Sequence, residues 1–263
     1  MTSLSARPLA LACAFLGFAA CALAQSPLER AEALLDQGEF LAAERLIESL
    51  ALAKKPDPVA VWELSRVRTG QHQTEEGIRL AEKAIKLDSK QARFHAQLGA
   101  AIMEHMTEVS RIDQSSWGNR MRKAFEKALD LDPRNLVALL GLSRYYWSTP
   151  PASGGDLGKA QQFAERARQV DPLKGELELG AVAARRNDLP AALKHFEAAT
   201  ELGPTNVDAQ ISCGHILMRL GRLTDARERY ENALRLSPRS DLARVSLEAL
   251  DAAVKAAEAK PAR

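Results

Sequence analysis

The chain repeats itself with a period of 34 residues over its last third. The aligned pairs are Leu179-Gly180 with Cys213-Gly214, Ala192 with Ala226, Phe196 with Tyr230, Ala199 with Ala233, and Pro204 with Pro238. Earlier in the chain, Asp132-Pro133 and Asp171-Pro172 close similar amphipathic segments. Because proline ends a helix that runs into it, this period predicts a series of helical hairpins.

The small residues of the repeat indicate where helices cross. Gly180 and Gly214 stand in the middle of predicted helices, where Gly costs up to about 1 kcal/mol relative to Ala. Such a cost fits a close helix crossing, and we expect Phe196 and Tyr230 to fill the adjacent space between neighbouring hairpins. A hairpin with two apolar faces cannot bury both alone, so the hairpins must stack. The pattern predicts an all-α solenoid.

This spacing resembles the tetratricopeptide repeat, whose signature has Leu-Gly, Ala, an aromatic residue, Ala and Pro at fixed positions. The two repeats 173–204 and 207–238 match that signature closely. The resemblance implies a right-handed superhelical solenoid whose concave groove is lined by the first helix of each hairpin. In this family the groove commonly holds an extended peptide or a partner's helix.

The resemblance also implies which residues face the groove, at positions 2, 5, 9 and 12 of each first helix. These positions fall on Arg93, Ala96, Ala100 and Met103; on Asn135, Ala138, Leu142 and Tyr145; on Lys174, Leu177, Ala181 and Ala184; and on Asp208, Ile211, His215 and Met218. We expect binding to centre on Tyr145 and His215. The Lys and Asn that grip a C-terminal carboxylate in one subtype of the family are missing.

The repeats organise most of the chain. We expect a weak hairpin at 25–57, tetratricopeptide-like repeats at 58–238, and a capping helix with a frayed tail at 239–263. Insertions of about ten and about seven residues, near 108–119 and 148–154, are predicted to extend hairpin loops. The stripe expected to cap the last hairpin is Leu242, Val245, Leu247, Leu250 and Val254.

Residues 1–24 read as a signal peptide. Arg7 precedes the apolar run 9–20, which is too short to span a bilayer, and Ala22-Leu23-Ala24 offers a cleavage site. The alternative is that Cys21 is acylated and anchors the protein to a membrane. Either way we expect an exported, periplasmic protein with no membrane span.

The remaining chemistry points away from catalysis. The chain holds 36 basic and 34 acidic residues, a net charge of +2 that disfavours nucleic-acid binding. No catalytic motif or metal-ligand spacing is present, and no cofactor is expected. Cys213 lies in an apolar helical pattern and is expected to be buried. Asp156 is expected to cap a helix at 157–170 rather than help the loop before it bind an anion.

These observations support two functions. The first is a non-catalytic exported scaffold that binds a protein or peptide partner through the concave groove in a bacterial cell envelope. The alternative is an accessory component of an envelope transport system, in which Trp117 and Trp147 wall a small-ligand pocket.

Overall fold

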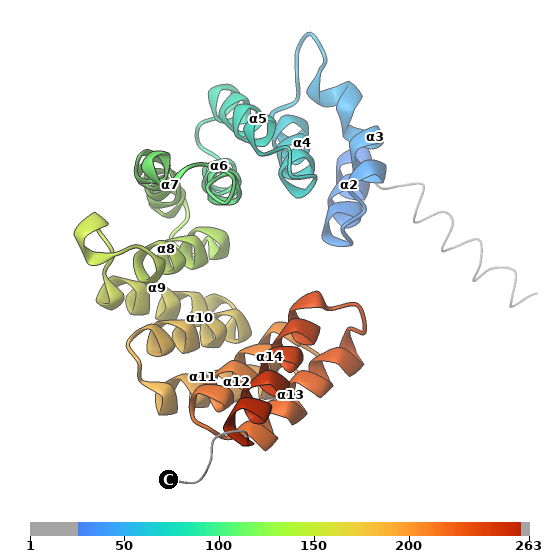
Figure 1. Cartoon of the computed structure of the whole chain (residues 1–263). Coiled ribbons are helices and arrows are strands. Elements are labelled where there is room, and N and C mark those ends of the chain that lie inside the picture. Colours follow the sequence, from blue (N-terminus) through green and yellow to red (C-terminus); the bar gives the residue numbers. More distant parts are fainter. Residues whose placement is uncertain (1–25, 259–263) are drawn as a thin grey trace, which may run out of the picture. The chain divides into compact units, whose positions relative to one another are not determined.

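The computed structural model describes residues 26–258, with side chains at 26–110 and 116–255, and this part of the chain is helical without a strand (Figure 1). The predicted all-α class is therefore confirmed. The predicted signal peptide, Cys21 and the last residues of the predicted tail lie outside the described residues. The chain divides into two compact units after Ser110, and each is described by itself.

Unit 1 contains two helical hairpins and one further helix. Its helices are α2 (Pro27–Asp36), α3 (Phe40–Ala51), α4 (Pro58–Gly70), α5 (Thr74–Leu87) and α6 (Ala92–His105). The Asp57 carboxylate accepts hydrogen bonds from the Val59 and Ala60 amides and so caps α4, with Pro58 at the first helical position. Trp62 and Leu64 of α4 and Phe94 of α6 pack in one apolar core.

Unit 2 contains a long helix, three hairpins and a terminal helix. The helices are α7 (Arg111–Leu131), α8 (Leu136–Ser148), α9 (Leu157–Val170), α10 (Pro172–Arg185), α11 (Leu189–Leu202), α12 (Val207–Arg219), α13 (Leu223–Leu236) and α14 (Asp241–Glu258). Consecutive helices pack against each other, as in a solenoid.

Glycines mark the helix crossings of the last two hairpins, as the repeat predicts. A Cβ on Gly180 would lie 2.6 Å from Cε1 of Phe196, and one on Gly214 would lie 2.4 Å from Cε1 of Tyr230. Each ring therefore covers the glycine of its own hairpin, rather than only filling space between hairpins as expected. Tyr230 is completely buried.

The insertion near 108–119 differs from the prediction. A loop extension was expected, but α7 begins at Arg111 and the inserted residues from there on are helical. The repeat whose first helix carries the expected groove residues Arg93 to Met103 therefore has that helix, α6, in unit 1 and its following helix, α7, in unit 2. Phe125 lies instead against Gly141 of α8, where an added Cβ would meet its ring at 2.4 Å.

The chain offers a physical reason for this packing. Phe196 follows Ala192 by four residues, whereas the residue four after Ala160 in the α8–α9 hairpin is Ala164. Because Ala164 supplies no ring, the space beside Gly141 is open to Phe125 from the preceding helix.

The loop between α8 and α9 contains a 3₁₀ turn at Pro151–Ser153. Gly154 follows with φ +98°, a left-handed conformation that favours glycine. The Asp156 carboxylate accepts hydrogen bonds from the Gly158 and Lys159 amides, so its predicted capping role is confirmed.

Helix α14 packs on the preceding hairpin with a different stripe from the one expected. Ala243, Ser246 and Leu250 are buried, while Leu242 and Val245 are 55% and 52% exposed. The assignment of these two residues to the capping stripe was therefore wrong. They stand 34 residues after Asp208 and Ile211, at the positions that face the groove in a repeat.

Candidate functional site

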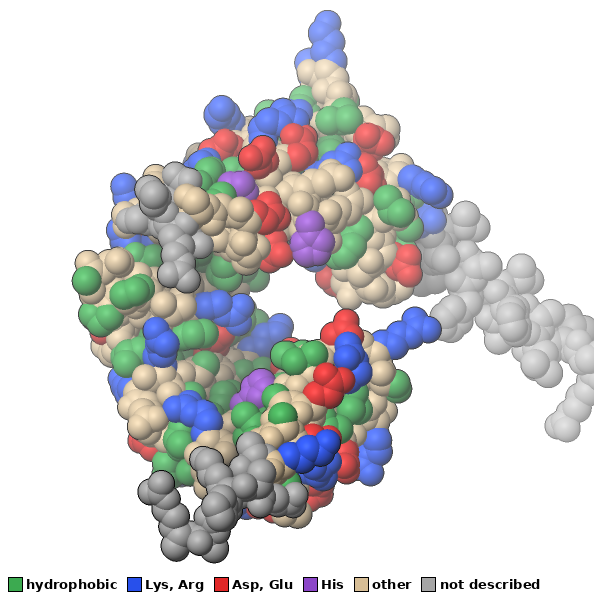
Figure 2. Space-filling view, viewed as in Figure 1, with side chains coloured by type: hydrophobic (Ala, Val, Ile, Leu, Met, Phe, Trp, Pro, Cys, Tyr) green, Lys and Arg blue, Asp and Glu red, His purple; other side chains and the backbone are tan. Residues whose placement is uncertain are grey.

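The first helices of the hairpins in unit 2 enclose a hollow of about 310 Å³, which we call the first-helix hollow. Its lining residues are Arg144 and Trp147 of α8; Leu177, Glu178 and Ala181 of α10; Phe196 of α11; Asp208, Ile211, Ser212 and His215 of α12; and Leu242 of α14. Figure 2 shows hydrophobic side chains mixed with Lys and Arg over this part of the chain.

The floor of the first-helix hollow is apolar. Ile211 is buried, Leu177 and Ala181 are half-buried, and Leu242 is exposed at the rim. An aliphatic floor of this kind can accept an apolar side chain and remove it from water.

One wall is organised by the buried carboxylate of Glu178, which is 7% exposed. Its oxygens accept hydrogen bonds from Arg144 Nη2 (3.1 Å), Trp147 Nε1 (3.0 Å) and Ser143 Oγ (3.2 Å). A buried carboxylate with three donors is well satisfied, and this one ties α10 to α8. The Arg144 side chain remains 56% exposed, so it presents charge to the outside.

The other wall holds His215. Its Nε2 shares a hydrogen bond with Ser246 Oγ (2.9 Å), and its ring lies edge-on to Tyr230 with centroids 5.6 Å apart. Burial lowers the pKa of the His215 imidazole, which favours the neutral ring. No carboxylate of a described residue orients this Ser–His pair, so it lacks the third member of a catalytic triad.

Unit 1 holds a hydroxyl, an imidazole and a carboxylate that also fall short of a catalytic arrangement. The Thr74 hydroxyl donates to Glu108 Oε2 (2.8 Å) and lies 2.9 Å from His105 Nδ1. Since a hydroxyl has one proton, the imidazole must donate to Thr74. In a nucleophile–base pair the hydroxyl donates to the imidazole, so the order here is reversed.

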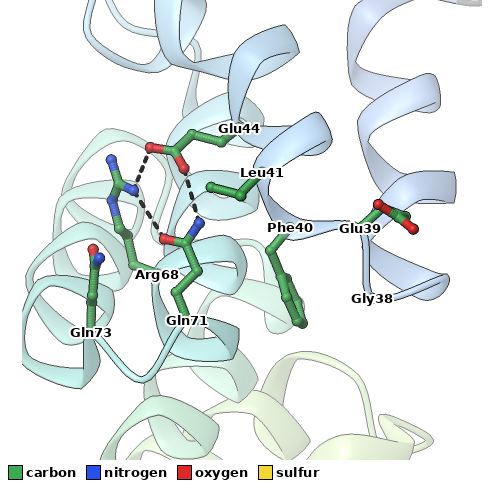
Figure 3. A pocket seen from close by; sticks show the side chains of 8 residues that line it. All are labelled: Gly38, Glu39, Phe40, Leu41, Glu44, Arg68, Gln71 and Gln73. Carbon is green, nitrogen blue, oxygen red and sulfur yellow. Dashed lines mark hydrogen bonds and ion pairs between the residues drawn. The ribbon is translucent and has the colours of Figure 1, made fainter.

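Unit 1 has two further hollows, each lined in part by charged and amide side chains. One of about 650 Å³ is lined by Glu44, Arg68 and Gln71 together with the turn before α3 (Figure 3). Arg68 pairs with Glu44, and Gln71 Nε2 donates to Glu44 Oε2 (3.0 Å). The hydrogen bond from Gln71, aided by Arg68, lowers the pKa of Glu44. These side chains satisfy one another's hydrogen-bonding groups and charges, and they join α3 to α4.

The structure places five of the expected groove residues in the first-helix hollow: Leu177, Ala181, Asp208, Ile211 and His215. Met218 is half-buried against the core, and Lys174 is exposed at the start of α10 beside Asp171. Asn135 accepts a hydrogen bond from the Ala138 amide and thus caps α8.

The expectation for Leu142 and Tyr145 as groove-facing residues was wrong. Leu142 is completely buried, and Tyr145 is 6% exposed with its ring edge-on to Tyr146 at 5.1 Å. The Tyr145 hydroxyl lies near Gly154, so the side chain supports the loop after α8. Arg144 and Trp147 take their place in the hollow.

The remaining two, Arg93 and Met103, lie on α6 of unit 1. The Arg93 guanidinium carbon is 4.6 Å from the centre of the Trp62 ring, a cation–π contact. Met103 is half-buried.

Sequence reasoning missed Arg144, Glu178, Ser212 and Leu242. Leu242 could have been found by continuing the period past Pro238, since it stands at groove position 2 of a further first helix. Trp147 was proposed as a pocket wall and lines the hollow, whereas Trp117 lies under Arg120 on α7 and does not line it.

Three further sequence expectations concern metal ions, Cys213 and membranes. Within the described residues, no three His, Cys, Asp or Glu side chains are grouped so that they could hold a metal ion. Cys213 is completely buried, as predicted, and burial raises the pKa of its thiol to about 11. Among the helices of the described residues, none combines the length and apolar character needed to cross a membrane.

Comparison with known proteins gives a family match over part of the chain. Residues 177–241, which contain much of the first-helix hollow, match the tetratricopeptide repeat family model. No curated protein matches the chain.

Several solved structures share the fold. PilW, a widely conserved type IV pilus biogenesis factor, superposes with a TM-score of 0.63 at 15% identity, over 84% of this chain and 96% of that one. Human IFIT1, solved as a dimer with PPP-AAAA, gives 0.56 at 18% identity, over 80% of this chain and 54% of that one. A double mutant of MamA RS-1 gives 0.52 at 16% identity, over 72% and 99%. At these identities the likeness concerns the fold alone.

Proposed function

We propose that this chain is a non-catalytic tetratricopeptide repeat scaffold that binds a protein or peptide partner in the first-helix hollow. Proteins built from these repeats are generally protein-interaction scaffolds. The observation that carries the proposal is the convergence of three first helices, α8, α10 and α12, and the terminal helix α14 on one apolar floor with a polar rim.

The lining has the composition that interfaces favour. Trp and Arg are enriched among residues that dominate binding energy, and both stand here on one wall. Trp147 and Arg144 are held by Glu178, so little side-chain freedom is lost when a partner binds. At about 310 Å³, the hollow is large enough for apolar side chains of a bound segment and leaves the rest of that segment on the rim.

The experiment compares two exposed leucines of unit 2. Leu242 is 55% exposed at the rim, and Leu202, 53% exposed on α11, does not line the hollow. A photo-crosslinking residue at each position identifies what contacts the protein, and the purified partner is then titrated against Leu242→Asp and Leu202→Asp. We expect Leu242→Asp to weaken binding by roughly tenfold or more and Leu202→Asp to leave it unchanged. Equal effects of the two variants would remove the hollow from the binding site.

The small-ligand alternative remains a second candidate because Trp147 lines the hollow. Its indole N–H is already donated to Glu178, so what it offers a ligand is its ring face. A small molecule that protects the fluorescence of Trp147 from quenching and competes with the crosslinked partner would favour this alternative.

We further propose that the protein is exported to the periplasm of a bacterial cell envelope. The support is the apolar run 9–20 followed by Ala22-Leu23-Ala24. Mass spectrometry of the mature protein should find Gln25 as the first residue. A lipid on Cys21 would instead show that the protein is membrane-anchored.

A further inference from the structure

Three arginines line the first-helix face of unit 2. They are Arg144 of α8, Arg185 of α10 and Arg219 of α12, and we call them the arginine row. Arg185 and Arg219 stand 34 residues apart, at the same position of consecutive repeats. Each is four residues after a residue that lines the hollow, Ala181 or His215, and therefore lies on the same face of its helix.

Two guanidinium groups of the row, those of Arg185 and Arg219, are held in place by the preceding hairpin. Arg185 Nε donates to the Trp147 carbonyl (3.2 Å), and Arg219 Nη2 donates to Asn187 Oδ1 (2.8 Å). A guanidinium has five N–H donors, so these contacts leave several unused. The side chains of Arg185 and Arg219 are exposed, and this arrangement orients them while keeping them open to a ligand.

Little negative charge of the protein offsets the row. Neither Arg185 nor Arg219 pairs with a carboxylate of a described residue. Glu178 neutralises Arg144 from a buried position. The exposed acid of the lining, Asp208, is in the first turn of α12, while Arg219 ends that helix. Two of the three arginines of the row, Arg185 and Arg219, therefore carry positive charge that no paired carboxylate balances, beside an apolar floor.

We infer that the segment bound in the first-helix hollow is acidic, with an apolar side chain in the hollow flanked by Asp or Glu side chains that meet the arginine row. This inference rests on the proposed function and adds the chemistry of the partner. Guanidinium groups bind carboxylates with paired, charge-assisted hydrogen bonds. A nucleic acid fits less well, because the floor is aliphatic and the whole chain has a net charge of only +2.

The test is a selection of 12-residue peptides from a random displayed library on the purified protein. We expect the enriched peptides to carry an apolar residue flanked by Asp or Glu. Their affinity should fall by roughly tenfold or more in Arg185→Gln with Arg219→Gln, and should fall as salt is raised. The variant Arg134→Gln with Arg235→Gln removes the same charge from exposed positions elsewhere in unit 2 and should bind normally.

One further double variant and three ligands make the test more specific. Arg185→Lys with Arg219→Lys keeps the charge but loses the paired guanidinium hydrogen bonds, so its affinity should lie between those of the unaltered protein and of the Gln variant. Amidated and free-acid forms of one enriched peptide should bind equally, because side-chain carboxylates are the ligand. A preference for the free acid would overturn the inference, as would a single-stranded oligonucleotide that binds more tightly through the same arginines.

The outcomes separate the two proposals. Enrichment of neutral or basic peptides whose affinity falls in Leu242→Asp but not in Arg185→Gln with Arg219→Gln would refute the acidic partner. The hollow would then still be the binding site. Both the binding site and the acidic partner would be refuted if the enriched peptides bound equally well to the Leu242 and arginine-row variants, or if no peptide were enriched. Melting of each variant shows whether a loss of binding reflects unfolding.

Discussion

Gly214→Ala should destabilise the protein although alanine is the better helix former. The new Cβ would lie 2.4 Å from Cε1 of Tyr230, whereas carbon atoms in contact prefer about 3.5–4.0 Å, so the ring would have to move by about 1 Å or more. Tyr230 is completely buried and its ring lies against His215, so it has little room to yield. Overpacking of a core costs about 1–3 kcal/mol, and the gain in helix propensity offsets up to about 1 kcal/mol.

We therefore expect a net loss of about 1–2 kcal/mol, which corresponds to a melting temperature lower by about 2–8 °C. Urea and thermal unfolding followed by circular dichroism measure it. The control is a double-mutant cycle with Tyr230→Leu, which removes the ring atoms that the new methyl group meets. An unchanged or higher stability of Gly214→Ala, or an equal cost in the Tyr230→Leu background, would refute this account of the glycine.

Three further predictions follow from buried groups. Tyr230→Phe should leave stability unchanged or raise it by up to about 1 kcal/mol in urea unfolding, because the buried hydroxyl makes no hydrogen bond with a described residue. Burial raises the pKa of Glu63 from 4.5 to about 7, so between these pH values the folded protein holds a proton that the unfolded chain has lost. The free energy of unfolding should therefore fall as pH rises from about 4.5 to 7. In Glu63→Gln this part of the pH dependence of the urea midpoint should be absent. Cys213, buried with a raised thiol pKa, should react with a water-soluble disulfide reagent only after denaturation, and rapid reaction of the folded mature protein would contradict its placement.

Much of the fold could be read from the sequence because the determinants are local and repeated. The helix crossings at Gly180 and Gly214 are set within a single hairpin, so one period is enough to predict them, whereas the contact of Phe196 and Tyr230 with the glycine of their own hairpin came only from the structure. The cap at Asp156 involves amides two and three residues away. Such contacts depend on neighbours in the chain, and a pattern of residues records them directly.

The lining of the first-helix hollow was predicted only in part, because it depends on how whole helices pack. Position counting placed Leu177, Ile211 and His215 correctly in the first-helix hollow, since α10 and α12 belong to regular repeats. It failed for Tyr145, because α8 packs against Phe125 from an irregular preceding helix and presents Arg144 and Trp147 instead.

By itself, the sequence determined the helical hairpins, their glycine crossings and the burial of Cys213. Only the tertiary structure decided that residues from 111 onward lengthen α7, and that Leu242 and Val245 of α14 face outward. The reason is physical. An apolar stripe specifies that a helix face can be buried, but which stripe is covered depends on the neighbouring helix, and α14 packs on the α12–α13 hairpin through Ala243, Ser246 and Leu250.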